Sequence, residues 1–275
     1  MEPVFVLSLP PLEHMPLVAA GLRAAGVRLI EVGAWGGHAN LLDATGLAAA
    51  QRMLEQARVQ AYSYHPPFGT EYMLTSPDPQ KLCDAVEMNK RHMQAAAALG
   101  AKHYILHPSA RIQQADRALA VKSFRHGLRE LVAVADELDL FINVENMPDP
   151  SAFLGSQLDD LMWLVDAGDS DRVGVCLDTG HAYLCGYSMA DAVAAVGQRL
   201  FTIHWHDNDR TGDQHSLPGN GTINWREFFE ALSDIGWDKP VCLETRWPTS
   251  SSAEEFVSAV REALAERRAI VPGRQ

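Results

Sequence analysis

The stretch LFINVENMPDPSAFLGSQLDDLMWLVDAGDSDRVGVCLD, residues 140–178, contains two short apolar runs separated by a segment of helical period. The runs LFINVE at 140–145 and VGVCLD at 173–178 are rich in β-branched residues and have the length of strands, whereas 157–167 repeats apolar residues at helical spacing. Two strands joined by a helix are typical of a parallel pair, because a parallel connection must return the chain to the same end of the sheet. The stretch therefore predicts a parallel sheet with helical crossovers.

The same alternation of strand and helix occurs eight times along the chain. The predicted strands are VFVLSL (4–9), RLIEV (28–32), QAYSYH (60–65), HYILH (103–107), LFINVE (140–145), VGVCLD (173–178), LFTIHW (200–205) and PVCLE (240–244). The predicted helices are 16–25, 44–57, 79–99, 116–138, 157–167, 188–197, 225–235 and 253–268. No composition shift or low-complexity run divides these units. Eight such units in about 250 residues are typical of a TIM barrel. We therefore expect an α/β fold with a single (β/α)8 domain over residues 1–275 and a barrel core at about 4–268.

The composition excludes several classes of protein. The 275 residues carry a net charge of −12, with 47% hydrophobic and 21% charged residues, which excludes a mainly disordered chain. No apolar run is long enough to cross a membrane, and the start of the chain lacks the basic region of a signal peptide. The four cysteines show no CxxC spacing, which favours reduced thiols in a cytoplasmic protein. The number of chains that associate is left open.

The acidic charge also bears on the partner. It disfavours a protein whose affinity comes from neutralising nucleic-acid phosphates, although bound divalent cations would supply local positive charge. A small molecule is therefore the favoured partner, and nucleic acid is the weaker alternative.

Metal-binding side chains stand at the ends of six predicted strands. They are His65, His107, Glu145, Asp178, His204 and Glu244. The carboxyl ends of barrel strands meet at one mouth, so groups that are distant in sequence converge there. Packing requires no such residues at these positions, and for the set as a whole a functional role is the better interpretation.

Two local patterns extend this set. In CLDTGH, Asp178 and His181 flank a predicted strand-to-loop turn, and in GDQH the alternate residues Asp213 and His215 face the same way if the backbone is extended. The second pattern lies in a long connection, and such loops are usually functional. Packed carboxylates repel one another unless a divalent ion pairs with them, and mixed imidazole and carboxylate ligands suit Zn²⁺, Mn²⁺, Co²⁺ or Fe²⁺. His206 alternates with His204, and we expect it to hydrogen-bond a ligand rather than bind metal.

A family resemblance follows from seven motifs. These are HPPFG, LHPSA, NVENMP, CLDTGHAYLCGY, IHWHDND, GDQHSLPGNGTINW and VCLET, which run from about His65 to Glu244. In this order they resemble the xylose-isomerase-like TIM-barrel superfamily, which contains sugar isomerases and epimerases and the endonuclease IV type of DNA-repair enzyme.

The epimerase branch and the repair branch imply different sites. Resemblance to epimerases implies one metal ion, with His181 beside the substrate and Arg210 directed at the sugar; the ion's ligands would be Glu145, Asp178, His204 and Glu244. In that interpretation His65 and His107 are left to line the substrate site. Trp35 follows the predicted strand at 28–32, which places it either at the mouth as a further substrate contact or in the packing of the loop. Resemblance to endonuclease IV implies three ions. The first would be held by His65, His107 and Glu145, the second by Glu145, Asp178, His204 and Glu244, and the third by His181, Asp213 and His215.

These alternatives predict different chemistry. In an epimerase, Glu145 and Glu244 exchange a proton with a substrate carbon through an enediolate, in a small ketose, sugar phosphate or related polyol. In a phosphodiesterase, clustered zinc ions activate water, and Glu145 is held as a bridge between two of them. Arg210 and the acidic composition favour the isomerase or epimerase, and the extra ligand types favour the phosphodiesterase. A metal-binding barrel without activity ranks third, because both proton-transfer carboxylates are present.

Overall fold

A computed structural model describes residues 5–8, 27–34, 40–109 and 116–245, with isolated positions at 258, 262, 265 and 266. Within these residues, eight parallel strands form a closed barrel in which each strand pairs with its sequence neighbours and β1 pairs with β8. The strands are β1 (Phe5–Ser8), β2 (Leu29–Gly33), β3 (Gln60–His65), β4 (His103–Leu106), β5 (Phe141–Glu145), β6 (Val173–Asp178), β7 (Leu200–Trp205) and β8 (Val241–Leu243). The predicted (β/α)8 class is confirmed, and each predicted strand is found to within one or two residues.

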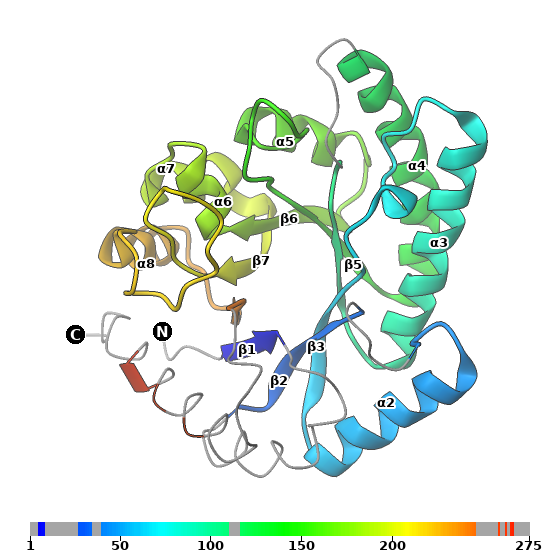
Figure 1. Ribbon diagram of the computed structural model, residues 1–275, viewed down its shortest axis with the longest axis horizontal. Coiled ribbons are helices and arrows are strands. Elements are labelled where there is room, and N and C mark those ends of the chain that lie inside the picture. The colour runs from blue at the N-terminus through cyan, green and yellow to red at the C-terminus, as the bar shows by residue number, and fades with distance from the viewer. Residues whose placement is uncertain are drawn as a thin grey trace.

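Helices surround the barrel (Figure 1). Those that the structure describes are α2 (Ala44–Ala57), α3 (Pro79–Ala98), α4 (Arg117–Leu138), α5 (Leu158–Asp166), α6 (Thr179–Leu184), α7 (Met189–Val196) and α8 (Trp225–Asp234), with single turns η2 (Thr70–Tyr72) and η4 (Gly197–Arg199). The predicted helices at 16–25 and 253–268 lie outside the continuous described segments, so they are not tested. In the described part of the chain, no helix is long and apolar enough to cross a bilayer.

The expected strand-to-loop turn after Asp178 is wrong, because helix α6 begins there. The backbone N–H of His181 donates to Asp178 Oδ1 at 2.7 Å, so Asp178 caps the helix that follows its own strand. A capping aspartate satisfies an N–H group that has no partner inside the helix. The cap fixes His181 one turn beyond the end of β6.

The long connection between β7 and α8 is held in place by Asp207. This buried carboxylate accepts hydrogen bonds from Gly219 N at 2.8 Å, Ile223 N at 3.2 Å and Trp225 Nε1 at 2.9 Å. Buried donors need such partners, because leaving one unpaired costs about 1–3 kcal/mol. The segment that carries Asp213 and His215 is therefore attached to the barrel at its base.

The hydrophobic core lies between the outer face of the sheet and the helices. Tyr64 and Ile142 from the strands are fully buried, as are Phe124 and Leu128 from α4. The four cysteines are free thiols: Cys176 and Cys242 are buried, Cys185 is half-buried and Cys83 is exposed. The helices pack against the outer face of the sheet and hold the parallel strands in a barrel. The polar residues at the carboxyl ends of these strands therefore lie at one mouth.

Candidate functional site

The carboxyl ends of the strands surround one cavity. It has a volume of about 460 Å³, which lies in the range of small-molecule sites. Its polar lining residues are His65, His107, Glu145, His181, Asp213, His215 and Glu244, and its apolar lining residues are Pro67, Phe68, Met147, Pro148 and Phe153. Strand ends, three loops and helix α6 thus contribute to the same chamber.

The four residues that both interpretations predict as ligands of one shared ion lie together at the base of this cavity. Glu145, Asp178, His204 and Glu244 each offer one ligand atom, and these atoms lie within 4.8 Å of one another. The Nδ1 atom of His204 is 3.3 Å from Glu145 Oε1 and 3.1 Å from Glu244 Oε2. Four donors at this separation can surround one ion, since such ligands lie only about 2.0–2.2 Å from it.

The electrostatics of this group are compatible with a bound cation. Glu145, Asp178 and Glu244 lie close to the imidazole of His204, and Glu31 adds a fourth carboxylate behind that ring. Burial raises the pKa of Glu145, but His204 and His107 outweigh this effect and hold that pKa well below its ordinary value. Buried carboxylates that stay ionised need compensating charge. The mixture of carboxylate and imidazole donors therefore fits a divalent ion of the zinc or manganese type.

A second group of donors lies against Glu145. The Nε2 atom of His107 is 3.2 Å from Glu145 Oε2, the Nε2 atom of His65 is 3.7 Å from the same oxygen, and the two rings lie 4.7 Å apart. Burial and the neighbouring His107 lower the pKa of His65, which favours the neutral imidazole that binds metal. The structure thus brings together the residues predicted for a second ion, with Glu145 between the two groups.

A third group lies where α6 meets the β7–α8 connection. Asp213 Oδ2 is 3.3 Å from His181 Nε2 and 3.1 Å from His215 Nε2. Burial lowers the pKa of both histidines, but Asp178 and Asp213 raise that of His181 to about 10, and Asp213 and Glu244 raise that of His215 to about 9. The expected extended backbone is wrong here, because His215 has φ of 47°, in the left-handed region. The two side chains meet through a turn instead.

His206 occupies the position expected of a partner to a ligand. Its Nε2 atom lies 2.8 Å from Asp178 Oδ2, and its side chain is fully buried. His206 also groups with His181, Asp213 and His215 as a set of potential ligands. The hydrogen bond to Asp178 orients that carboxylate, as partners of metal ligands usually do.

One predicted substrate contact, Arg210, is not among the described residues that line this cavity. The side chain of Arg210 is exposed, and its guanidinium carbon lies 4.0 Å from the centre of the Tyr183 ring. Trp35 lies outside the described residues. The roles of Arg210 and Trp35 therefore stay predictions.

Sequence reasoning missed Glu31, which lies on β2 below the mouth. Its Oε2 atom is 3.1 Å from His204 Nε2, and the side chain is fully buried. The available signal was an acidic residue inside the apolar run RLIEV. A buried acid in a core strand needs a partner, and that requirement marks it as unusual.

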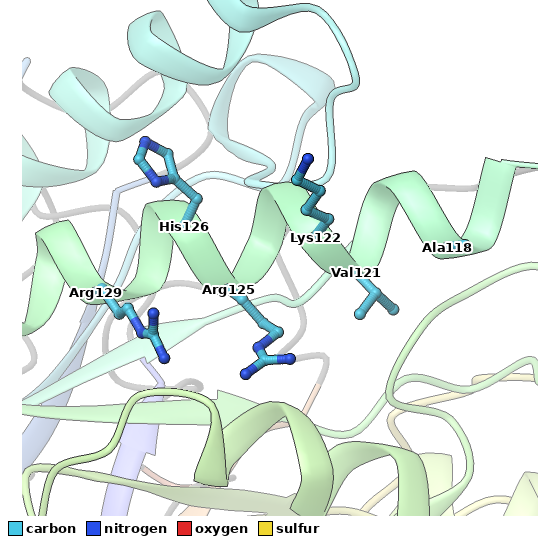
Figure 2. A pocket seen from close by; sticks show the side chains of 6 residues that line it. All are labelled: Ala118, Val121, Lys122, Arg125, His126 and Arg129. Atoms are coloured by element: carbon cyan, nitrogen blue, oxygen red, sulfur yellow. The ribbon is translucent and has the colours of Figure 1, made fainter.

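A second cavity, of about 420 Å³, lies on the outer wall of the barrel along α4 (Figure 2). Lys122 and His126 project to one side of the helix and Arg125 and Arg129 to the other. None of the described residues that line it carries a carboxylate, so this part of the chain offers no acidic ligands for a divalent ion there. The mouth of the barrel is therefore the candidate site.

Comparisons with known proteins agree with this architecture. A family model described as xylose isomerase-like TIM barrel matches residues 19–267. An uncharacterized protein of Methanocaldococcus jannaschii is 30% identical over 52% of the chain and 51% of its own length. A D-psicose 3-epimerase of Enterocloster bolteae is 31% identical over 48% of the chain and 41% of its own length. A probable endonuclease 4 of Mycoplasmoides gallisepticum is 28% identical over 54% of the chain and 53% of its own length. The chain thus spans about half the length of these curated relatives.

Solved structures resemble the fold at lower identity. A D-psicose 3-epimerase with D-tagatose, from Clostridium cellulolyticum, superposes with a TM-score of 0.80 at 17% identity, covering 98% of this chain and 99% of that one. The IolI protein with a bound zinc atom superposes with a TM-score of 0.78 at 17% identity, covering 99% of this chain and 100% of that one. At this level of identity the likeness shows the fold and leaves the activity to the site itself.

Proposed function

Because the chain belongs to the xylose isomerase-like TIM-barrel family, we propose that it is a metal-dependent isomerase or epimerase of a small sugar, sugar phosphate or related polyol. The observation that carries the proposal is the placement of Glu145 and Glu244. Both are in the four-residue ligand group, and both also line the cavity where a substrate carbon would lie. A relative described as a D-psicose 3-epimerase supports the same class of chemistry.

The proposed mechanism is proton transfer through an enediolate. One of the two glutamates takes the proton from a carbon next to a carbonyl, and a proton is returned from the same or the opposite carboxylate, so atoms and charge balance over the cycle. When bound, a divalent ion supplies positive charge for the oxygens that become negative. His181, His65 and His107 line the cavity within reach of substrate hydroxyls. Phe68, Phe153 and Met147 form its apolar wall and limit access of water.

The dense ligand set favours a second candidate, a multinuclear zinc phosphodiesterase of the endonuclease type. The clusters of potential ligands that contain His107, His204 and Asp213 all lie at one mouth, which supports a centre of up to three ions. A relative described as a probable endonuclease 4 supports this alternative. We rank it second because a bridging Glu145 loses its value as a free base and because the chain carries a net charge of −12, which opposes binding of nucleic acid. A barrel that binds metal without catalysis ranks third.

The metal and the location are part of the proposal. We propose one ion at the four-residue ligand group, zinc, manganese, cobalt or iron, with up to two further ions at the groups around His107 and His215. A cytoplasmic location is proposed because all four cysteines are free thiols.

Exchange of substrate protons with solvent separates the two chemistries. The chain is incubated in deuterated water with a panel of ketoses, ketose phosphates and inososes, and incorporation of deuterium at carbon is followed by NMR. We expect exchange in at least one panel member. Glu145→Gln and Glu244→Gln should each suppress it while retaining most of the metal, because an amide keeps an oxygen ligand but cannot take a proton.

Glu137→Gln is the matched control, since Glu137 is an exposed residue of α4 outside the cavity lining. This variant should exchange like the wild type. No exchange in any panel member, together with zinc-dependent cleavage of abasic-site DNA, would replace the epimerase with the phosphodiesterase.

A further inference from the structure

Glu31 is buried behind the proposed metal site and bonded to two partners. Its Oε2 atom accepts a hydrogen bond from Ser63 Oγ at 2.7 Å and lies 3.1 Å from His204 Nε2. Glu31 and His204 are both fully buried and are 173 positions apart in sequence. A buried carboxylate is costly unless it is paired, so this contact indicates a function for the charge.

An irregularity in the pairing of β2 with β3 brings Glu31 to this position. The register between β2 and β3 shifts between Ile30 and Glu31, so that Ile30 pairs with Ala61 and Glu31 pairs with Ser63. The irregularity leaves Tyr62 unpaired in the ladder and places the Ser63 hydroxyl beside the carboxylate. Such bulges re-aim side chains near functional sites.

The two nitrogens of His204 face different groups. Nδ1 faces Glu145 and Glu244, which belong to the proposed ligand set, whereas Nε2 faces Glu31. A neutral imidazole carries one N–H and one lone pair. If Nε2 carries the hydrogen and donates it to Glu31, the lone pair on Nδ1 points to the place where an ion would bind.

We propose that Glu31 is a positioning residue that fixes the tautomer and the ring orientation of His204 and thereby strengthens binding of the divalent ion. Ser63 supports it by holding the carboxylate in place. The inference rests on the proposed metal site and adds a residue that is not among those lining the cavity. Removing a hydrogen-bond partner of a metal ligand typically weakens metal binding by about 10–100-fold.

The test measures the dissociation constant for Zn²⁺ by competition with a chromophoric chelator, at fixed pH, together with the number of ions bound. Glu31→Gln keeps the shape and an acceptor oxygen but removes the charge, and we expect it to weaken binding of the tightest ion about tenfold or more. Ser63→Ala should weaken it by less, and the number of ions should not change in either variant. Tyr104→Phe is the matched control, because it removes a buried hydrogen bond to Asn89 outside the cavity lining.

The possible results separate a positioning role of Glu31 from a role as a ligand and from general destabilisation. An unchanged dissociation constant in both Glu31→Gln and Ser63→Ala, with the wild type binding metal, overturns the role of Glu31 alone. Loss of one equivalent of bound metal in Glu31→Gln also overturns the positioning role, since Glu31 would then be a ligand. If Glu31→Gln does not fold, Ser63→Ala decides. Equal weakening in Tyr104→Phe would assign the effect to general destabilisation, and a wild type that binds no metal would end the proposed function as well.

Discussion

The Nε2 atom of His107 lies 3.2 Å from Oε2 of Glu145, so a side chain that follows β4 contacts the carboxylate that ends β5. This contact determines how free Glu145 is to move a proton. With one ion bound in the four-residue ligand group, His107 is a hydrogen-bond partner of Glu145. With a second ion between them, Glu145 becomes a bridging ligand and a poor base.

Replacement of His107 therefore distinguishes the two states. We expect His107→Ala to keep one tightly bound equivalent and to lower proton exchange by no more than about tenfold, the smaller end of the effect of removing a partner of a metal ligand. Metal analysis and deuterium incorporation on the same sample give both numbers. Loss of a metal equivalent together with loss of phosphodiesterase activity would show instead that His107 binds an ion of a hydrolytic centre.

Replacement of Asp178 removes a proposed ligand and a helix cap at once. We expect Asp178→Ala to lose the bound ion and all activity. The metal-free variant should lose about 2–4 kcal/mol of folding free energy, because about 1 kcal/mol is the usual cost of an N-cap and leaving the buried His206 without this partner adds about 1–3 kcal/mol. Asp43→Ala is a matched control, because Asp43 caps α2 through Gly46 N at 2.7 Å and lies outside the cavity lining. Metal content, activity and urea unfolding are measured for both variants. Full activity in a metal-depleted Asp178→Ala protein would contradict the assignment.

The sequence was sufficient to predict which strand ends meet, because the spacing of apolar residues identifies the strands and the residue types identify their polar ends. Glu145 and Glu244 stand at the ends of apolar runs, and parallel strands of a barrel share one mouth. Helix α6 was missed because Asp178 looked like a ligand before a loop, and the same carboxylate also caps a helix. The pattern of an aspartate three residues before His181 was a capping signal that the metal interpretation obscured.

Contacts that depend on tertiary register were beyond the sequence. Glu31 meets His204 only because β2 and β3 are shifted at a bulge, and no local pattern predicts that shift. Asp213 and His215 come together through a left-handed residue rather than an extended strand. The positions of site residues were therefore predictable from the sequence where the backbone is regular. The directions of their side chains were not predictable where the backbone is irregular.

The pKa values of His181 and His215 predict how the metal-free protein responds to pH. Their pKa values of about 10 and about 9 lie above the ordinary 6.5, so the protonated histidines stabilise the fold fully below pH 6.5. That stabilisation is lost as pH rises through the folded-state values. We expect the Tm of chelator-treated protein to fall by about 3 °C or more between pH 6.5 and 9, since 1 kcal/mol shifts Tm by about 2–4 °C in a chain of this size.

Metal binding should show the opposite trend, because an ion at these histidines displaces their protons, and the apparent affinity then rises with pH. Calorimetry of chelated and zinc-loaded protein measures both trends. Asp213→Asn removes the shared partner of the two histidines and should flatten the pH dependence of the chelated protein. A Tm that stays constant or rises from pH 6.5 to 9 in the chelated wild type is incompatible with protonated His181 and His215.

Gly180 leaves room for the ring of His206. A Cβ at position 180 would overlap the His206 imidazole, whose Nε2 lies 2.8 Å from Asp178 Oδ2. Gly180→Ala must therefore move the imidazole or α6, which costs about 1–3 kcal/mol of stability, as overpacking usually does. Since His206 orients a proposed ligand, we expect metal affinity to fall about tenfold as well. Gly212→Ala is the matched control, because a Cβ there meets nothing within 4 Å. Chelator competition and urea unfolding are measured on both variants. Destabilisation of Gly180→Ala with unchanged metal affinity would show that His206 packs against α6 without orienting Asp178.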